Sequence, residues 1–225
     1  HEENNYGRDR RPRRHGKAIC KELGKTSVIV LAGRNLAKME AAKVELDELG
    51  VERHLCKTDI ADRAQVQALA EFAASLGDVT QVIHTSGVSP SDTATENIIR
   101  INAAGTVNMV EAFYLVLAGG GVMINFSSVA AYTMPQTDEW SQAFEAWNEP
   151  DFYDRLLTPM HQKLIDNQPE TAENQLELIP AGRWGHPYEM GALTVFLCSS
   201  GAGYINGVDI LADGGQNAGV FVPQI

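Results

Sequence analysis

The sequence predicts an α/β fold, a doubly wound parallel sheet, and leaves open whether all the strands of that sheet are present. Short apolar runs alternate with amphipathic helical patterns, as in parallel strands joined by helical crossovers. The run from Val122 to Phe126 is apolar throughout, which is typical of a strand covered on both faces. The helical pattern before it supplies the crossover. We expect the strand ending near His84 and this one to finish at the same edge, where α/β proteins bind ligands.

Each expected element has its own local signal. A helix over residues 17–23 stops at Gly24, and strands are expected over 27–32, 51–57 and 208–211. Asp62 with Gln65 has the spacing of a capping box, and Pro187 marks the first turn of a late helix. Helical spacing predicts three buried faces: Leu36, Met39, Ala42, Leu46 and Leu49; Val66, Leu69, Phe72, Ala73 and Leu76; Ile98, Ile101, Gly105, Met109, Ala112 and Val116.

Composition narrows the classes of partner and compartment. The net charge of −11 argues against a nucleic-acid or membrane surface, and the only basic cluster is Arg8 to Arg14. No apolar run approaches the ~18 residues of a membrane span and no signal-peptide pattern is visible, so we expect a cytoplasmic protein. Cys20, Cys56 and Cys198 lack metal-binding or disulfide spacing, so we expect reduced thiols and no metal.

The chain is expected to form one domain behind a polar tail. Residues 1–15 are charged and aperiodic, which predicts a disordered or artefactual segment. Residues 16–225 are expected to form a single domain. The chain as a whole is 44% hydrophobic, which is enough for one core. Within residues 133–180, Trp140, Phe144 and Trp147 recur at helical spacing. They indicate either a lid over the ligand edge or packing against the domain or a second subunit, and we favour packing.

Seven short motifs follow one another between Gly16 and Gly215. They are Ala32-Gly33-Arg34-Asn35, Thr58-Asp59-Ile60, Ser86-Gly87, Ile101-Asn102-Ala103-Ala104-Gly105, Asn125-Phe126-Ser127-Ser128, the stretch 182–190 and the stretch 207–215. In this order they resemble the classical short-chain dehydrogenase/reductase family. The resemblance implies a Rossmann-like NAD(P)-binding domain, an oxidoreductase that transfers hydride between the cofactor and a small carbonyl or secondary alcohol, and a homodimer or homotetramer.

The resemblance also implies which residues hold the dinucleotide. Asp59 and Ile60 would flank the adenine, and Ser86 and Gly87 would lie beside the cofactor ribose. Arg34 stands where an acidic residue would accept the ribose hydroxyls of NAD; a guanidinium suits a 2′-phosphate, so NADP(H) is preferred, the alternative being a surface arginine. The full implied set is Gly16, Arg34, Asn35, Asp59, Ile60, Ser86, Gly87 and Thr158.

Two residues match the catalytic pattern of the family. Ser128 corresponds to the serine that hydrogen-bonds the substrate oxygen, and Asn102 to the structural and catalytic asparagine. Simpler interpretations exist for the neighbouring side chains. Ser128 could only satisfy a strand end, Asp59 could only cap a turn, and His84 could be a core histidine.

Two family features are missing from the sequence. The charged tail replaces the first strand and all of the Thr-Gly-x-x-x-Gly-x-Gly turn except Gly16. No tyrosine has a lysine four residues later, so the family's Tyr-x-x-x-Lys pair is absent. We expect a deletion just before Thr158 and a frame change or replacement at the N-terminus, although residues omitted from the sequence would give the same pattern.

These departures predict consequences for folding and rate. Loss of a positioned acid/base costs roughly 10²–10⁴-fold in rate. Without the first strand its two neighbours lose their common partner, which leaves backbone groups unpaired or requires another segment to close the sheet. Three hypotheses follow: a short-chain oxidoreductase of doubtful activity, a catalytically inactive dinucleotide-binding or interaction protein of the same fold, or a truncated product without stable function.

Overall fold

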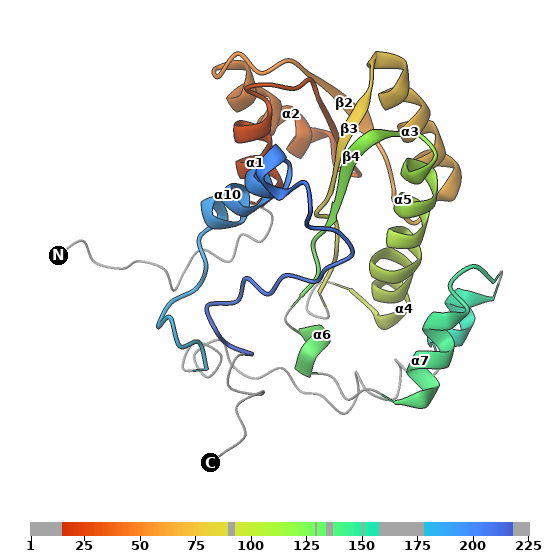
Figure 1. Ribbon diagram of the computed structural model, residues 1–225. Helices are drawn as coiled ribbons and strands as arrows, with labels where there is room; N and C mark the ends of the chain where they lie inside the picture. Colours follow the sequence, from red (N-terminus) through yellow and green to blue (C-terminus); the bar gives the residue numbers. More distant parts are fainter. Residues whose placement is uncertain are drawn as a thin grey trace.

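The strands form two separate parallel pairs. The computed structural model describes residues 15–89, 93–128, 130–133, 137–149, 151–157 and 178–217. β1 (Ile29–Gly33) pairs with β2 (Arg53–Lys57), and β3 (Val79–His84) pairs with β4 (Leu117–Asn125), each in parallel register. Helices lie on both sides of these strands (Figure 1), so the expected α/β class is confirmed.

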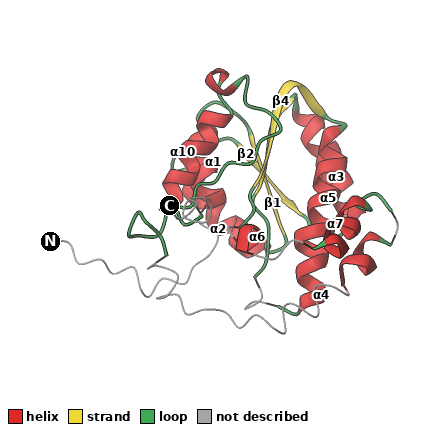
Figure 2. Ribbon diagram, turned by 60° about the horizontal axis from the view of Figure 1, so that its bottom comes forward, coloured by secondary structure: helices red, strands yellow, loops and turns green. Residues whose placement is uncertain are grey.

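The longer helices lie on two opposite sides of the strands, which both views show (Figures 1 and 2). One group packs α1 (His15–Leu23) against α10 (Pro187–Leu197): a Cβ on Gly191 of α10 would lie 3.7 Å from the carbonyl carbon of Ala18 in α1. The first group comprises α1 (His15–Leu23), α2 (Leu36–Asp47) and α10 (Pro187–Leu197), and the second comprises α3 (Arg63–Leu76) and α5 (Gly105–Tyr114).

The third expected helix is interrupted. α4 (Thr95–Ile98) is followed by a π-helical turn, η1 (Ile99–Ala104), before α5 begins. The sequence pattern predicted one continuous helix here, which is wrong in this detail. The i→i+5 hydrogen bonds of a π-helix make a wider turn than an α-helix, which shifts the side chains that follow, and such turns are frequent at functional sites. Asn102, a predicted site residue, lies within η1.

The main core lies between the β3–β4 pair and helices α3 and α5. The predicted inward faces of α3 and α5 are largely buried, except that Leu76 of α3 is 41% exposed. In the face predicted for α2, Leu36 and Leu49 are 47% and 56% exposed. Helix α2 contacts β1, β2 and α1, and Met39 and Leu46 are its buried residues. The core cluster is Ile60, Val66, Leu69, Ala70, Val82, Ile101, Met109, Ala112 and Phe113.

A second, smaller cluster involves the aromatic region. α7 (Asp138–Glu145) places Ala143 against Ile99 of η1, together with Phe152 and Leu156 from helical residues 152–157. Trp140 stacks on Phe144 with ring centroids 5.9 Å apart. The described part of this region therefore packs against the outer side of η1.

The expected strand over residues 208–211 is absent. These residues form no regular secondary structure, and Val208, Ile210 and Leu211 are 59%, 41% and 43% exposed. An isolated apolar run becomes a strand only when a neighbouring strand edge accepts its hydrogen bonds, and no described strand does so. The remaining short elements are α6 (Ala130–Thr133) and the 3₁₀ turn η2 (Ser200–Ala202).

A cavity separates the two strand pairs. β1 and β3 are not hydrogen-bonded to each other, and a cavity of about 470 Å³ is lined by both strands along their lengths. This arrangement agrees with the expectation of a sheet that lacks the common neighbour of two strands. We call this cavity the strand slot.

Candidate functional site

All four strands end at a single polar edge. Gly33 lies opposite Lys57 at the end of one pair, and His84 lies opposite Asn125 at the end of the other. Pairing continues one residue further, because the Phe126 amide donates to the His84 carbonyl at 2.9 Å. The predicted meeting of the strand ends near residues 85–87 and 127–128 is therefore correct.

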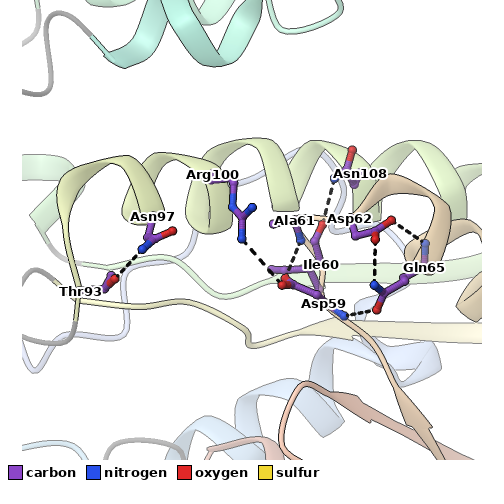
Figure 3. Close-up of polar contacts among 9 residues, drawn as sticks. All are labelled: Asp59, Ile60, Ala61, Asp62, Gln65, Thr93, Asn97, Arg100 and Asn108. Atoms are coloured by element: carbon purple, nitrogen blue, oxygen red, sulfur yellow. Dashed lines mark hydrogen bonds and ion pairs between the residues drawn. The ribbon is translucent and has the colours of Figure 1, made fainter.

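The loop after β2 is held by a polar network that Figure 3 shows. The Asp59 amide donates to Gln65 Oε1 at 3.0 Å, and Asp59 Oδ1 accepts the Ala61 amide at 3.1 Å. Asp59 Oδ2 lies 3.9 Å from the Arg100 guanidinium. The Asp59 carboxylate thus caps its own turn, and its predicted place beside adenine stays a prediction.

Ile60 is held from both sides. Its carbonyl accepts a 2.9 Å hydrogen bond from Asn108 Nδ2 of α5 (Figure 3), and its side chain is only 8% exposed. A Cβ on Gly105 would lie 2.9 Å from Ile60 Cδ1, closer than carbon atoms approach. Gly105 therefore allows α5 to pack against the loop that carries Ile60.

Asn102 fixes the loop that follows β3. Its Oδ1 accepts the Val88 amide at 2.9 Å and its Nδ2 donates to the Val88 carbonyl at 2.8 Å. The same oxygen is 3.4 Å from where a Cβ on Gly87 would lie, so the loop passes close to Asn102. Ser86 and Gly87 remain exposed at the edge. The Asn102 side chain therefore acts as a positioning group for the predicted ribose-binding turn.

A buried histidine extends this network. His84 is 3% exposed, and its Nε2 lies 3.2 Å from Thr106 Oγ1, which donates to the Asn102 carbonyl at 2.7 Å. Burial lowers the pKa of His84, so the imidazole is neutral at neutral pH. The interpretation of His84 as a core histidine fits these contacts.

The start of α1 reaches the same edge. A Cβ on Gly16 would lie 3.1 Å from Thr85 Oγ1, so the helix begins close against the end of β3. Among the predicted cofactor residues, Gly16, Ile60 and Ser86 line the strand slot. Arg34, Asn35, Asp59 and Gly87 are not among the residues that line it, and Thr158 lies outside the described residues.

Two further predicted residues lie at the end of β1. The Arg34 side chain is exposed. Asn35 forms the N-cap of α2, where its Oδ1 accepts the Lys38 amide at 3.0 Å. This contact gives the Asn35 side chain a structural role. Its predicted contact with the cofactor stays a prediction.

The region after β4 differs from the catalytic pattern that the family resemblance implies. Ser128 is exposed, and its carbonyl accepts the Ala131 amide at the start of α6. One turn later, Tyr132 donates its hydroxyl proton to Asp209. The carboxylate of Asp209 raises the pKa of Tyr132. A tyrosine that serves as a general acid at neutral pH needs the opposite shift.

Sequence reasoning missed a tight ion pair before α10. Arg183 binds Glu189 through two nitrogens at 2.9 and 2.7 Å, and the His186 amide donates to Glu189 Oε2 at 2.6 Å. The Arg183 guanidinium and this amide lower the pKa of Glu189 from 4.5 to about 2. The signal was present, because His186 and Glu189 have the spacing of a capping box.

In the described residues, no group of three or more His, Cys, Asp or Glu side chains could hold a metal ion. Within the same part of the chain, no helix has the length and apolar character to cross a membrane.

Two protein-family models match the chain. A short chain dehydrogenase model matches residues 15–141, and an enoyl-(acyl carrier protein) reductase model matches residues 155–217. D-threitol dehydrogenase of Mycolicibacterium smegmatis is 31% identical, with 70% of each chain covered. A short-chain dehydrogenase/reductase of Alternaria brassicicola is 23% identical over 252 positions, covering 90% of this chain and 92% of that protein. That span exceeds the 225 residues of this chain, so the relative has residues without a counterpart here.

Solved structures show the same fold. Levodione reductase superimposes with a TM-score of 0.68 at 21% identity, with 90% of this chain and 93% of that chain covered. A gluconate 5-dehydrogenase from Burkholderia cenocepacia, in complex with NADP and tartrate, gives a TM-score of 0.65 at 21% identity, with 90% of each chain covered. The matched family model spans more than half of the sequence. The chain therefore belongs to the short-chain dehydrogenase/reductase family of oxidoreductases.

Proposed function

We propose that this protein transfers hydride between NADP(H) and a carbonyl or secondary alcohol of a small molecule. The observation that supports this most is the polar edge at which the four strands end. There, side-chain hydrogen bonds from Asn108 and Asn102 hold the loops after β2 and β3 in place. NADP(H), when bound, supplies or accepts the hydride. The relatives named D-threitol, galactitol and gluconate dehydrogenases make polyols and sugar acids the first substrates to test.

The preference for NADP(H) rests on Arg34. Its exposed guanidinium follows β1, beside the N-terminus of α2. A 2′-phosphate there gains a charge-assisted hydrogen bond from a fixed cation, whereas the 2′-hydroxyl of NAD(H) gains much less. NADP is also the cofactor in two similar solved structures.

Arg34 can be tested by equilibrium binding. We expect Arg34→Ala to weaken NADPH binding by about tenfold or more, since hydrogen bonds to charged groups contribute about 1.5–3 kcal/mol, and to leave NADH binding within about twofold. Lys38→Ala, which removes an exposed cation one turn into the same helix, is the matched control and should change neither. Equal losses for both cofactors in Arg34→Ala would contradict the assignment.

Ser128 and Asn102 have different roles in this proposal. Ser128, exposed at the end of β4, would hydrogen-bond the substrate oxygen. Asn102 acts through Val88 and sets the turn at Ser86 and Gly87, so it is a positioning residue. Gly16, Asp59 and Ile60 would border the cofactor on the other side of the edge.

Turnover should be slow. The sequence contains no Tyr-x-x-x-Lys pair, and Tyr132 is bound to a carboxylate. Loss of a positioned acid costs roughly 10²–10⁴-fold in rate. We therefore expect measurable but weak activity in a homodimer or homotetramer, whose size light scattering would give.

The assay follows NADP⁺ reduction with threitol, galactitol and gluconate, and NADPH oxidation with the corresponding carbonyl compounds. Ser128→Ala should lower kcat/KM at least tenfold, because the substrate oxygen loses its donor. Ser127→Ala, next to it and also exposed, is the control and should stay within about twofold. NADPH binding without any turnover would instead identify an inactive dinucleotide-binding protein.

A further inference from the structure

The strand slot has backbone edges on two sides. Ile29–Gly33 of β1 and Val79–His84 of β3 line it along their whole lengths. Among the described residues, β1 pairs only with β2 and β3 pairs only with β4. The second edge of each strand therefore presents amide and carbonyl groups that have no strand partner there. Buried backbone groups in folded proteins are nearly always hydrogen-bonded.

The other two sides of the slot are apolar. Ile19, Cys20 and Leu23 of α1 line it from one side. Leu69 and Ala73 of α3, with Met109 and Phe113 of α5, line it as well, and these helices lie on the opposite side of the strands in both views (Figures 1 and 2). A chain placed in the slot would be covered by apolar side chains on both faces.

These walls define the chemistry of the occupant. One extended peptide has amide and carbonyl groups along both of its edges, which matches β1 and β3 together. Because both faces are covered by helices, its side chains must be apolar at successive positions. A compact small molecule would leave most of the strand groups unpaired.

Three segments of this chain outside the described residues are long enough to supply such a peptide. Residues 1–14 contain five arginines, and residues 158–177 contain five charged side chains. Burial of such charges without partners is strongly unfavourable. Residues 218–225, with the sequence AGVFVPQI, carry no charged side chain and include three successive strand-forming residues, Val220, Phe221 and Val222.

The length and position of this tail are compatible with the slot. Eight extended residues reach roughly 26–29 Å, and the six residues of β3 rise about 20 Å. Tyr132 binds Asp209, so the chain leading to the tail passes α6, just beyond the carboxyl end of β4. Pro223 has no amide hydrogen, so a hydrogen-bonded ladder would end after Val222.

We propose that residues 218–225 of the same chain insert into the strand slot and pair through Val220–Val222 with β1 and β3. The insertion joins the two strand pairs into one sheet. It also fixes the mouth of the slot, where Gly16, Thr85 and Ser86 lie, and so sets the distance between the two sides of the ligand edge.

Hydrogen exchange tests this proposal without reference to activity. Phe221→Asp should prevent insertion because it would bury a carboxylate, and amides of β1 and β3 should then exchange at least tenfold faster. Gln224→Asp adds the same charge beyond Pro223 and is the matched control, expected to exchange like the unaltered chain. Equal exchange in β1 and β3 for all three proteins would overturn the proposal.

A chain that ends at Asn217 provides the second measurement. If it folds, β1 and β3 should lose protection, and a synthetic peptide of residues 218–225 should restore it whereas the peptide with Asp at 221 should not. If it does not fold alone, refolding with the first peptide but not the second should recover the protein. Failure of both peptides would contradict the proposal. Amide protection of β1 and β3 that decreases when the full chain is diluted would also contradict it, because a second copy of the chain would then supply the tail.

Discussion

The two ends of the ligand edge are organised to different degrees. The loop after β2 is fixed by Gln65, Ala61 and Asn108, all within 3.1 Å hydrogen bonds. The region after β4 instead pairs the exposed Tyr132 with Asp209, a contact that raises the pKa of the tyrosine. The loop predicted to border the dinucleotide is therefore held by several hydrogen bonds, whereas the tyrosine next to the predicted substrate-binding serine is bound to a carboxylate.

Among the substitutions that test the order of the loop after β2, Gly105→Val should have the largest effect. A Cβ there would already lie 2.9 Å from Ile60 Cδ1, and overpacking of a core costs about 1–3 kcal/mol. We expect a decrease in the free energy of unfolding in that range, with weaker NADPH binding. Gly119→Val is the control, because no atom lies within 4 Å of its Cβ position. Urea denaturation measures both, and equal stability of the two variants would show that the Ile60 loop does not depend on Gly105.

Asn108→Ala should have the next largest effect. It removes the donor to the Ile60 carbonyl, and an unsatisfied buried acceptor costs about 1–3 kcal/mol. Because Asn108 is only half-buried, we expect the lower end of that range, about 1 kcal/mol. Asn97→Ala, which removes an exposed side-chain hydrogen bond to Thr93 (Figure 3), should cost less than about 0.5 kcal/mol. A larger decrease in the free energy of unfolding for Asn97→Ala than for Asn108→Ala would contradict the role given to Asn108 in holding the loop after β2.

Acid sensitivity should be smaller and local to the turn before α10. The folded-state pKa of Glu189 is about 2, below its ordinary 4.5, so its pairing with Arg183 stabilises the fold above pH 4.5 and is lost as the pH falls toward 2. In Glu189→Gln the midpoint temperature should fall less steeply over this pH range. Glu139→Gln in α7 is a control, and an identical pH slope in all three proteins would exclude this contribution.

The smallest effect concerns Tyr132 itself. Asp209→Asn removes the carboxylate that raises the pKa of Tyr132, so that pKa should move down toward its ordinary value. Ultraviolet difference spectra against Tyr132→Phe would follow this single phenol. Activity should stay low in Asp209→Asn, because no lysine stands four residues after Tyr132. A large gain in turnover would show that Asp209 alone suppresses catalysis.

Local patterns in the sequence predicted a large part of the fold. Asp62 caps α3 by accepting the Gln65 amide, Pro187 opens α10, and the β3–β4 crossover runs in parallel as expected. These features depend on residues close in the chain or on one apolar period. The interruption of the helix at η1 coincides with hydrogen bonds between Asn102 and Val88, 14 residues away, and no local pattern encodes such a contact.

The candidate site was less accessible from sequence alone. Asn108 lies 48 residues from Ile60, and Tyr132 lies 77 residues from Asp209, so neither pair could be inferred from spacing. The strand expected over residues 208–211 shows the same limit, because an apolar run forms a strand only beside a free edge. Family resemblance identified Ser128 and Asn102, but only the geometry shows that the Asn102 side chain is occupied by the Val88 backbone.

A thermal-unfolding titration with NADPH and, separately, NADH tests the central claim most directly. A ligand that binds only the folded protein adds about 2.7 kcal/mol at roughly a hundredfold excess over Kd. If the edge holds NADP(H) through Arg34, NADPH should raise the midpoint of a cooperative transition more than NADH does. A cooperative transition that neither cofactor moves would contradict dinucleotide binding at this edge.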